Sequence, residues 1–90
     1  MATSPVAIEL LLLPQGRQLN FAKDLLEIID IARRVGGESA PWELVAHNAR
    51  SPFVDTRNFP AGTLIEYYAQ HLSQHGADVG RSNVVSTTQS

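Results

Sequence analysis

Cysteine is absent from this sequence of 90 residues, and lysine occurs only once, at Lys23. Without cysteine the chain has no disulfide bond and no thiolate to act as a nucleophile or metal ligand. Small secreted domains usually need disulfides, so this absence favours a reducing, cytoplasmic location. Domains that bind nucleic acid concentrate Lys and Arg on one face, and the formal net charge here is −2. The charge balance therefore disfavours nucleic acid as a partner.

Long apolar runs are also absent. The stretch from Ile8 to Leu13 is interrupted by Glu9 and is far shorter than the roughly 20 residues of a membrane-spanning helix. The N-terminus lacks the basic region and the cleavage site of a signal peptide, and neither end carries a lipidation motif. With 43% hydrophobic residues, the composition is that of one ordinary globular domain. We expect no membrane partner.

The pattern along the chain predicts a mostly α fold, a small domain of three or four helices over residues 1–76. The first segment runs from Ser4, a helix N-cap followed by Pro5, to Leu13, and Pro14 ends it. So short an apolar run also fits a buried strand, and both alternatives stay open. Residues 77–90 are rich in Ser, Thr and Gln and are predicted to form a disordered C-terminal tail.

The second segment, Phe21 to Val35, gives the clearest helical pattern. On a helical wheel its apolar residues cover roughly 220°, about twice the width that a helix on a small core needs. Its polar stripe places Lys23–Glu27 and Asp30–Arg34 at i,i+4 spacing. Two further helices are predicted at residues 40–50, with Trp42 facing the core, and from Pro60 or Thr63 to Gly76.

No constellation of catalytic residues is recognisable, so the chain is not expected to be an enzyme and no cofactor or small-molecule substrate is implied. His71 and His75 stand at i,i+4 spacing on the predicted last helix, which alone is a weak metal signal. No metal site is predicted. Arg50, Asp55 and Arg57 could together hold an anion, but they are interpreted as a solvated loop with an ion pair of little net value.

The positive prediction is a protein–protein interface, because so short a chain cannot enclose all its apolar surface. The simplest solution is a homodimer that buries part of the first two segments across a two-fold axis, with the remaining apolar and aromatic surface docked on a larger protein. If the first segment is a strand, its free edge can instead pair across that axis or add to a partner. The predicted partner or dimer interface comprises Ile8, Leu10, Leu11, Leu12, Phe21, Leu25, Leu26, Ile28, Ile29, Phe53, Phe59 and Tyr67.

A charged residue in place of Leu26 or Ile29 is expected to break the dimer or the partner complex and to leave helical, soluble protein. Two other functions remain open. One is a small DNA-binding helix-turn-helix regulator, disfavoured by the scarcity of basic residues. The other is a phage-encoded inhibitor of a host machine, which also acts by covering a surface.

Two stretches carry a resemblance to a known family. They are Pro-Val-Ala-Ile-Glu-Leu-Leu-Leu-Leu-Pro at residues 5–14 and Phe-Ala-Lys-Asp-Leu-Leu-Glu-Ile-Ile at residues 21–29. The chain resembles the small helical bacterial quorum-sensing antiactivators, which sequester acyl-homoserine-lactone receptor transcription factors. The resemblance implies a homodimeric inhibitor that binds a transcription factor and blocks its dimerisation and its binding to DNA. It carries over no individual functional residue.

Overall fold

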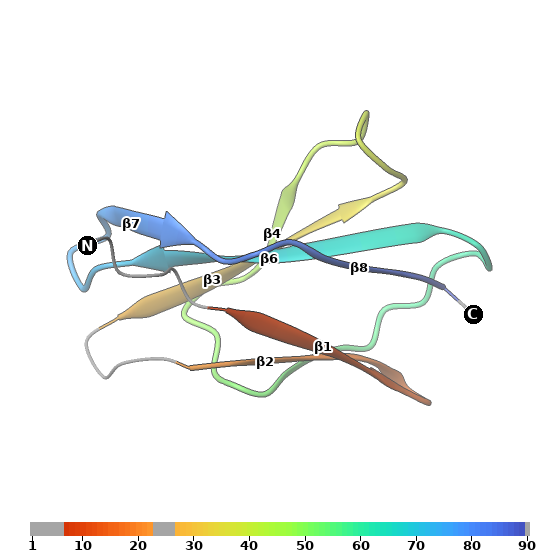
Figure 1. The fold of residues 1–90 in the computed structure, drawn as a ribbon, viewed down its shortest axis with the longest axis horizontal. Coiled ribbons are helices and arrows are strands. Elements are labelled where there is room, and N and C mark those ends of the chain that lie inside the picture. The colour runs from red at the N-terminus through yellow and green to blue at the C-terminus, as the bar shows by residue number, and fades with distance from the viewer. Residues whose placement is uncertain (1–6, 23–26, 90) are drawn as a thin grey trace.

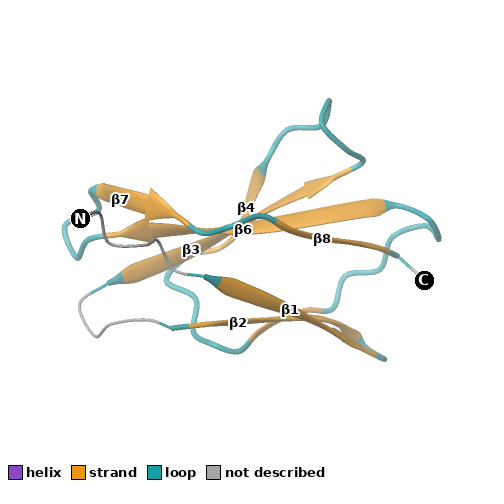
Figure 2. Cartoon of the chain, in the orientation of Figure 1, coloured by secondary structure: helices purple, strands orange, loops and turns teal. Residues whose placement is uncertain are grey.

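The chain is an antiparallel β-sandwich in the part that the computed structural model describes, residues 7–22 and 27–89. Every segment in that part is strand or loop, as Figure 2 shows. Sheet A has the order β1-β2-β5, with β1 (Ile8–Leu13), β2 (Gly16–Phe21) and β5 (Phe53–Asp55). Sheet B has the order β4-β3-β6, and β7 and β8 both pair with the far side of β6. Its strands are β3 (Ile28–Val35), β4 (Glu43–Ala46), β6 (Leu64–Leu72), β7 (Asp78–Arg81) and β8 (Val85–Thr88).

Sheet A is built on a tight hairpin. β1 and β2 pair from Ile8↔Phe21 to Leu13↔Gly16, and β5 adds to the other side of β2. In β2, buried Arg17, Leu19 and Phe21 alternate with less buried residues that face outward. β2 therefore presents one face to the core, and that face carries a charged residue.

Sheet B is organised around the long pairing of β3 with β6, which runs from Ile28↔Leu72 to Val35↔Ile65. Burial alternates along β6 as far as Ala69 and along the first half of β3, and the inward residues lie against sheet A, which is the lower layer in Figure 1. The core between the two layers consists of Ile8, Leu19, Phe21, Ile29, Ile31, Ala49, Ile65, Tyr67 and Ala69.

The prediction of a mostly α fold is therefore wrong. The first segment is a strand, β1, the alternative that the sequence had left open. The predicted second helix corresponds to the end of β2 and all of β3, with residues 23–26 outside the described part. β3 is rich in isoleucine, and a β-branched side chain packs well on a pleated surface but loses χ1 freedom in a helix.

The other predicted elements are corrected in the same way. The helix expected at residues 40–50 is loop and β4, and the helix expected to end at Gly76 is β6 followed by a turn. Residues 77–90, expected to be a disordered tail, include β7 and β8 of sheet B. Within residues 7–22 and 27–89 no helix is long and apolar enough to cross a membrane.

Candidate functional site

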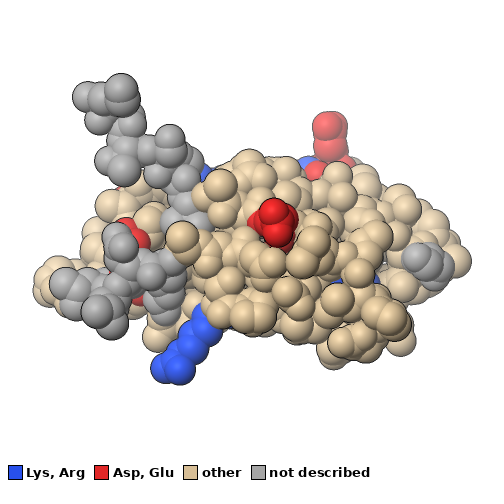
Figure 3. All heavy atoms as spheres, turned by 60° about the horizontal axis from the view of Figure 1, so that its bottom comes forward, with Lys and Arg blue, Asp and Glu red and all other residues tan. Residues whose placement is uncertain are grey.

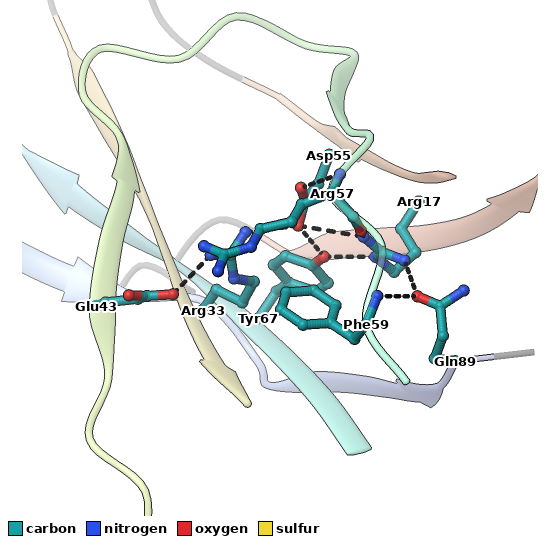
Figure 4. A network of polar contacts seen from close by, with 8 residues as sticks. All are labelled: Arg17, Arg33, Glu43, Asp55, Arg57, Phe59, Tyr67 and Gln89. Atoms are coloured by element: carbon teal, nitrogen blue, oxygen red, sulfur yellow. Dashed lines mark hydrogen bonds and ion pairs between the residues drawn. The ribbon is translucent and has the colours of Figure 1, made fainter. Parts of the chain in front are cut away.

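A buried polar network joins the two sheets (Figure 4). Its centre is the carboxylate of Asp55, at the end of β5, which accepts a hydrogen bond from the Tyr67 hydroxyl and one from Arg33 Nη1 at 3.0 Å. Arg17 donates through Nε to the Tyr67 hydroxyl oxygen at 2.7 Å, and its Nη2 lies 3.5 Å from Asp55 Oδ2. All four side chains are buried, so two guanidinium groups share one buried carboxylate.

Residues at the rim complete the network. Glu43 is half exposed and accepts a hydrogen bond from Arg33 Nη2 at 2.6 Å. The side-chain oxygen of Gln89 accepts from Arg17 Nη1 at 3.1 Å and from the Phe59 N–H at 3.3 Å. The Phe59 ring lies 5.6 and 5.2 Å from the guanidinium carbons of Arg17 and Arg33. The aromatic face thus adds cation–π stabilisation to the buried cations.

The pKa values of two groups at the centre of the network, the Asp55 carboxyl and the Tyr67 hydroxyl, move away from neutrality. Burial alone would raise the pKa of the Asp55 carboxyl, but hydrogen bonds from the Tyr67 hydroxyl, the Arg57 N–H and Arg33 outweigh burial, and its pKa is lowered. Burial and the neighbouring Asp55 carboxylate raise the pKa of the Tyr67 hydroxyl. The hydrogen bonds of the network join side chains of β2 and β5 in sheet A to side chains of β3 and β6 in sheet B.

The lowered pKa of Asp55 predicts a pH dependence of stability. In the unfolded chain this carboxyl regains its ordinary pKa of 3.8 and binds a proton more readily than in the folded chain. Its contribution is present above about pH 4 and is lost as the pH falls through the folded-state value. Denaturant titrations between pH 7 and pH 2 should show an acid loss of stability that is smaller in Asp55→Asn. Equal acid losses in the two proteins would contradict this assignment.

The edges of the two sheets differ in how well they are protected against pairing. A register shift interrupts the pairing of β4 with β3 and that of β7 with β6. β5 has three residues, and β8 is short and mostly polar. β1 pairs over six residues with no shift, and Glu9 is its one charged residue. Natural proteins usually protect an edge with bulges, charges or short strands, so β1 is the least protected edge of the described structure.

The outer side of β1 is only partly occupied. Ile8 N–H donates to Asn83 Oδ1 at 2.9 Å, and Asn83 Nδ2 donates to the Ile8 carbonyl oxygen at 3.2 Å. Backbone groups alternate in direction along a strand, so those of Leu10 and Leu12 point to the same outer side as those of Ile8. Leu12 is 63% exposed. Figure 3, which brings the β1–β2 side forward, shows a surface with few charged side chains.

A pocket of about 210 Å³ lies beside this edge, between the end of β1 and β8. Its lining consists of Leu12, Leu13, Pro14, Gly16, Arg17, Asn58, Thr87, Thr88 and Gln89. It is smaller than the roughly 300 Å³ at which small-molecule sites begin. It is larger than the cavity of about 150 Å³ that accommodates benzene. The pocket therefore has the size for a single large side chain, with an apolar wall on β1 and a polar wall on β8.

The structure divides the residues predicted to form an interface. Leu11 and Leu12 are exposed, and Leu10 is partly buried beside them. Four others belong to the core and are not available for contacts in the folded chain: Ile8, Phe21, Ile29 and Tyr67. Ile28, Phe53 and Phe59 are partly buried, and Leu25 and Leu26 lie outside the described residues. A charge at Ile29 is therefore expected to unfold the protein, and the helical product expected for that substitution is wrong.

The two histidines considered as a metal pair are separated by the fold. His71 lies in β6, with Nε2 2.6 Å from Glu27 Oε2, and His75 is exposed in the turn after β6. His47 contacts a different carboxylate, with Nδ1 2.7 Å from Asp30 Oδ1. Among the described residues, no group of three His, Asp or Glu side chains is placed to hold a metal ion.

Sequence reasoning missed the buried network and treated Asp55 as solvated. The detectable signal was the alternation of Arg17, Leu19 and Phe21 with Gly, Gln and Asn, which places the arginine on the buried face.

The helix-turn-helix alternative has no helices in the described part of the chain. Comparisons with protein-family models, with curated proteins and with solved structures give no match.

Proposed function

We propose that this protein is a non-enzymatic binding protein that takes an extended segment of a larger protein onto the outer edge of β1. The observation that carries the proposal is that β1 is the least protected edge of the described structure, with the backbone groups of Leu10 and Leu12 pointing outward. In strand addition, main-chain hydrogen bonds supply affinity and side-chain pockets supply selectivity. β1 has both features, because the pocket lined by Leu12 and Thr88 adjoins its edge.

Such binding inhibits by occlusion. A segment held on β1 is unavailable to the larger protein for its own dimerisation or for another ligand, and no chemical step is required. A transcription regulator as target, cytoplasmic action and an antiactivator role rest on composition and on the resemblance described above.

We expect Leu12→Lys to weaken target binding by about ten-fold or more, which corresponds to about 1.4 kcal/mol. The substitution places a cation on the edge and beside Arg17 in the pocket, and charged edge residues disfavour strand pairing. Leu44→Lys is the matched control, because Leu44 is 62% exposed on the edge strand β4 of the other sheet. The measurement is a binding titration. The target protein, captured from native cells, is titrated against the wild type, Leu12→Lys and Leu44→Lys.

A second variant tests the backbone directly. Leu12→Pro removes the outward N–H and leaves the hydrogen bonds to β2 in place, because Leu12 points its backbone away from β2. We expect Leu12→Pro to lose as much target binding as Leu12→Lys, and amide exchange at Leu10 and Leu12 of the wild type to be slower in the complex than in the dilute free monomer. Equal target affinity for wild type and Leu12→Pro, or exchange at these two amides that is as fast in the complex as in the dilute free monomer, would rule out strand addition at β1.

A further inference from the structure

We infer that, in the absence of its target, β1 pairs antiparallel with β1 of a second copy of this chain, about a two-fold axis through Leu11. The inference rests on the same accessible edge as the proposed function, and it adds a means of regulation. A copy whose edge is engaged in the dimer cannot take up a target segment, so dimerisation and target binding exclude one another.

The contacts of Asn83 select the register. In an antiparallel pair, two residues that both point their backbone groups toward the partner strand exchange two hydrogen bonds. Asn83 already satisfies the outward groups of Ile8, which leaves those of Leu10 and Leu12. An axis through Leu11 places Leu10 of each copy opposite Leu12 of the other, and all of these groups are then paired.

Neighbouring registers of the β1–β1 pair leave more of the outward backbone N–H and C=O groups without a hydrogen bond. An axis through Leu10 would place Leu12 opposite Ile8 of the second copy, whose outward groups are held by Asn83. An axis through Leu12 would place Leu10 opposite Pro14 of the second copy, which has no N–H to donate. The axis through Leu11 is therefore the self-complementary solution for this edge.

Charge and side-chain placement agree with that register. Leu11 faces Leu11 of the second copy, and Glu9 faces Leu13, so no like charges oppose one another. The two Glu9 residues lie four residue positions apart along the paired strands, roughly 14 Å. An axis perpendicular to the sheet keeps both buried faces on the same side and joins the two copies of sheet A into one continuous sheet.

The absence of cysteine makes this register directly testable. Leu11 and its counterpart would form a non-hydrogen-bonded pair, with Cα atoms about 4.5 Å apart, a separation that a disulfide can span. We expect Leu11→Cys to give a disulfide-linked dimer under mild oxidation, with about ten-fold more cross-linked product than Glu9→Cys, whose sulfurs would lie too far apart. Sedimentation of the wild type should show a monomer–dimer equilibrium that Leu12→Pro shifts to monomer.

The outcomes separate this inference from the proposed function. A wild-type monomer at all concentrations, or equal cross-linking at positions 9 and 11, overturns the dimer. If Leu12→Pro nevertheless loses target binding, the edge serves the target alone and the proposed function stands. If the β1 dimer forms but Leu12→Pro still binds the target normally, the dimer stands and strand addition of the target is wrong.

Discussion

Replacing Asp55 by asparagine is expected to lower the free energy of unfolding by about 3 to 5 kcal/mol. The carboxylate is the only buried negative charge near Arg17 and Arg33 in the described structure, and both guanidinium groups remain buried when it is removed. Glu43 can still neutralise Arg33 from the rim, but Arg17 loses its carboxylate partner. An uncompensated charge in the interior costs several kcal/mol.

Urea denaturation followed by tryptophan fluorescence of Trp42 measures this loss. The matched control is Glu43→Gln, which removes the other carboxylate on Arg33. Because 54% of the Glu43 side chain is exposed, solvent screens that pair, and its loss should cost no more than about 1 kcal/mol. Similar losses for the two variants would show that Asp55 does not hold the buried cations.

Gly16→Ala is expected to destabilise the fold by about 3 kcal/mol through overpacking. A Cβ at this position would lie 3.0 Å from both the Asp55 carbonyl carbon and the Thr56 Cα, and closer still to the Asp55 carbonyl oxygen. These are backbone atoms and cannot rotate away as a flexible side chain would. The first residue of β2 must therefore move away from β5, which disturbs the Arg17↔Asp55 pairing next to it.

Gln18→Ala is the control for Gly16→Ala, because Gln18 lies on the outward face of the same strand. It should cost well under half as much as the glycine substitution, since surface changes usually stay within about 0.5 kcal/mol. The thermal midpoints of the two variants provide the comparison. A Gly16→Ala protein as stable as Gln18→Ala would mean that β2 and β5 do not approach as closely as the structure places them.

The apolar stretches were recognisable from the sequence, but their secondary structure was not. β3 contains Ile29, Ile31 and Arg33 on its inward face and Asp30 and Arg34 on the other, a period of two residues. With Arg33 assigned to the surface, as arginines usually are, this alternation disappears and a helical arc emerges. The buried arginine was therefore the residue that made the pattern misleading.

β6 was misassigned for a related reason. Ile65, Tyr67 and Ala69 face the core, and Tyr68 lies on the outer face of sheet B, where its ring contacts Trp42 at 4.7 Å between centroids. Two adjacent tyrosines on opposite faces fit a strand, but a helical stripe can also accommodate both. Only the pairing of this segment with β3 distinguishes a strand from a helix here, and such long-range pairing leaves no local signal in one sequence.

The candidate site was partly predictable. The leucines of β1 and the possibility of a free strand edge followed from the sequence, because an apolar run bounded by prolines fits either element. The pocket did not follow, because residues from β1, β2, the loop at Asn58 and β8 meet there only after folding. The hydrogen bonds of Asn83 to Ile8, which select the register of the β1 pairing, join residues from opposite ends of the chain and could not be predicted from the sequence either.

Arg17 lines the pocket beside β1 and also belongs to the network that connects the two layers. A side chain that fills the pocket would contact Arg17 and would pack against residues of both sheets at once. Occupancy of the pocket and folding of the chain are then thermodynamically linked, so a bound segment stabilises the packing of the two sheets against one another. A substitution that removes one of the buried charges would consequently lower the affinity for a target. A saturating concentration of target would partly restore the stability that the substitution removes.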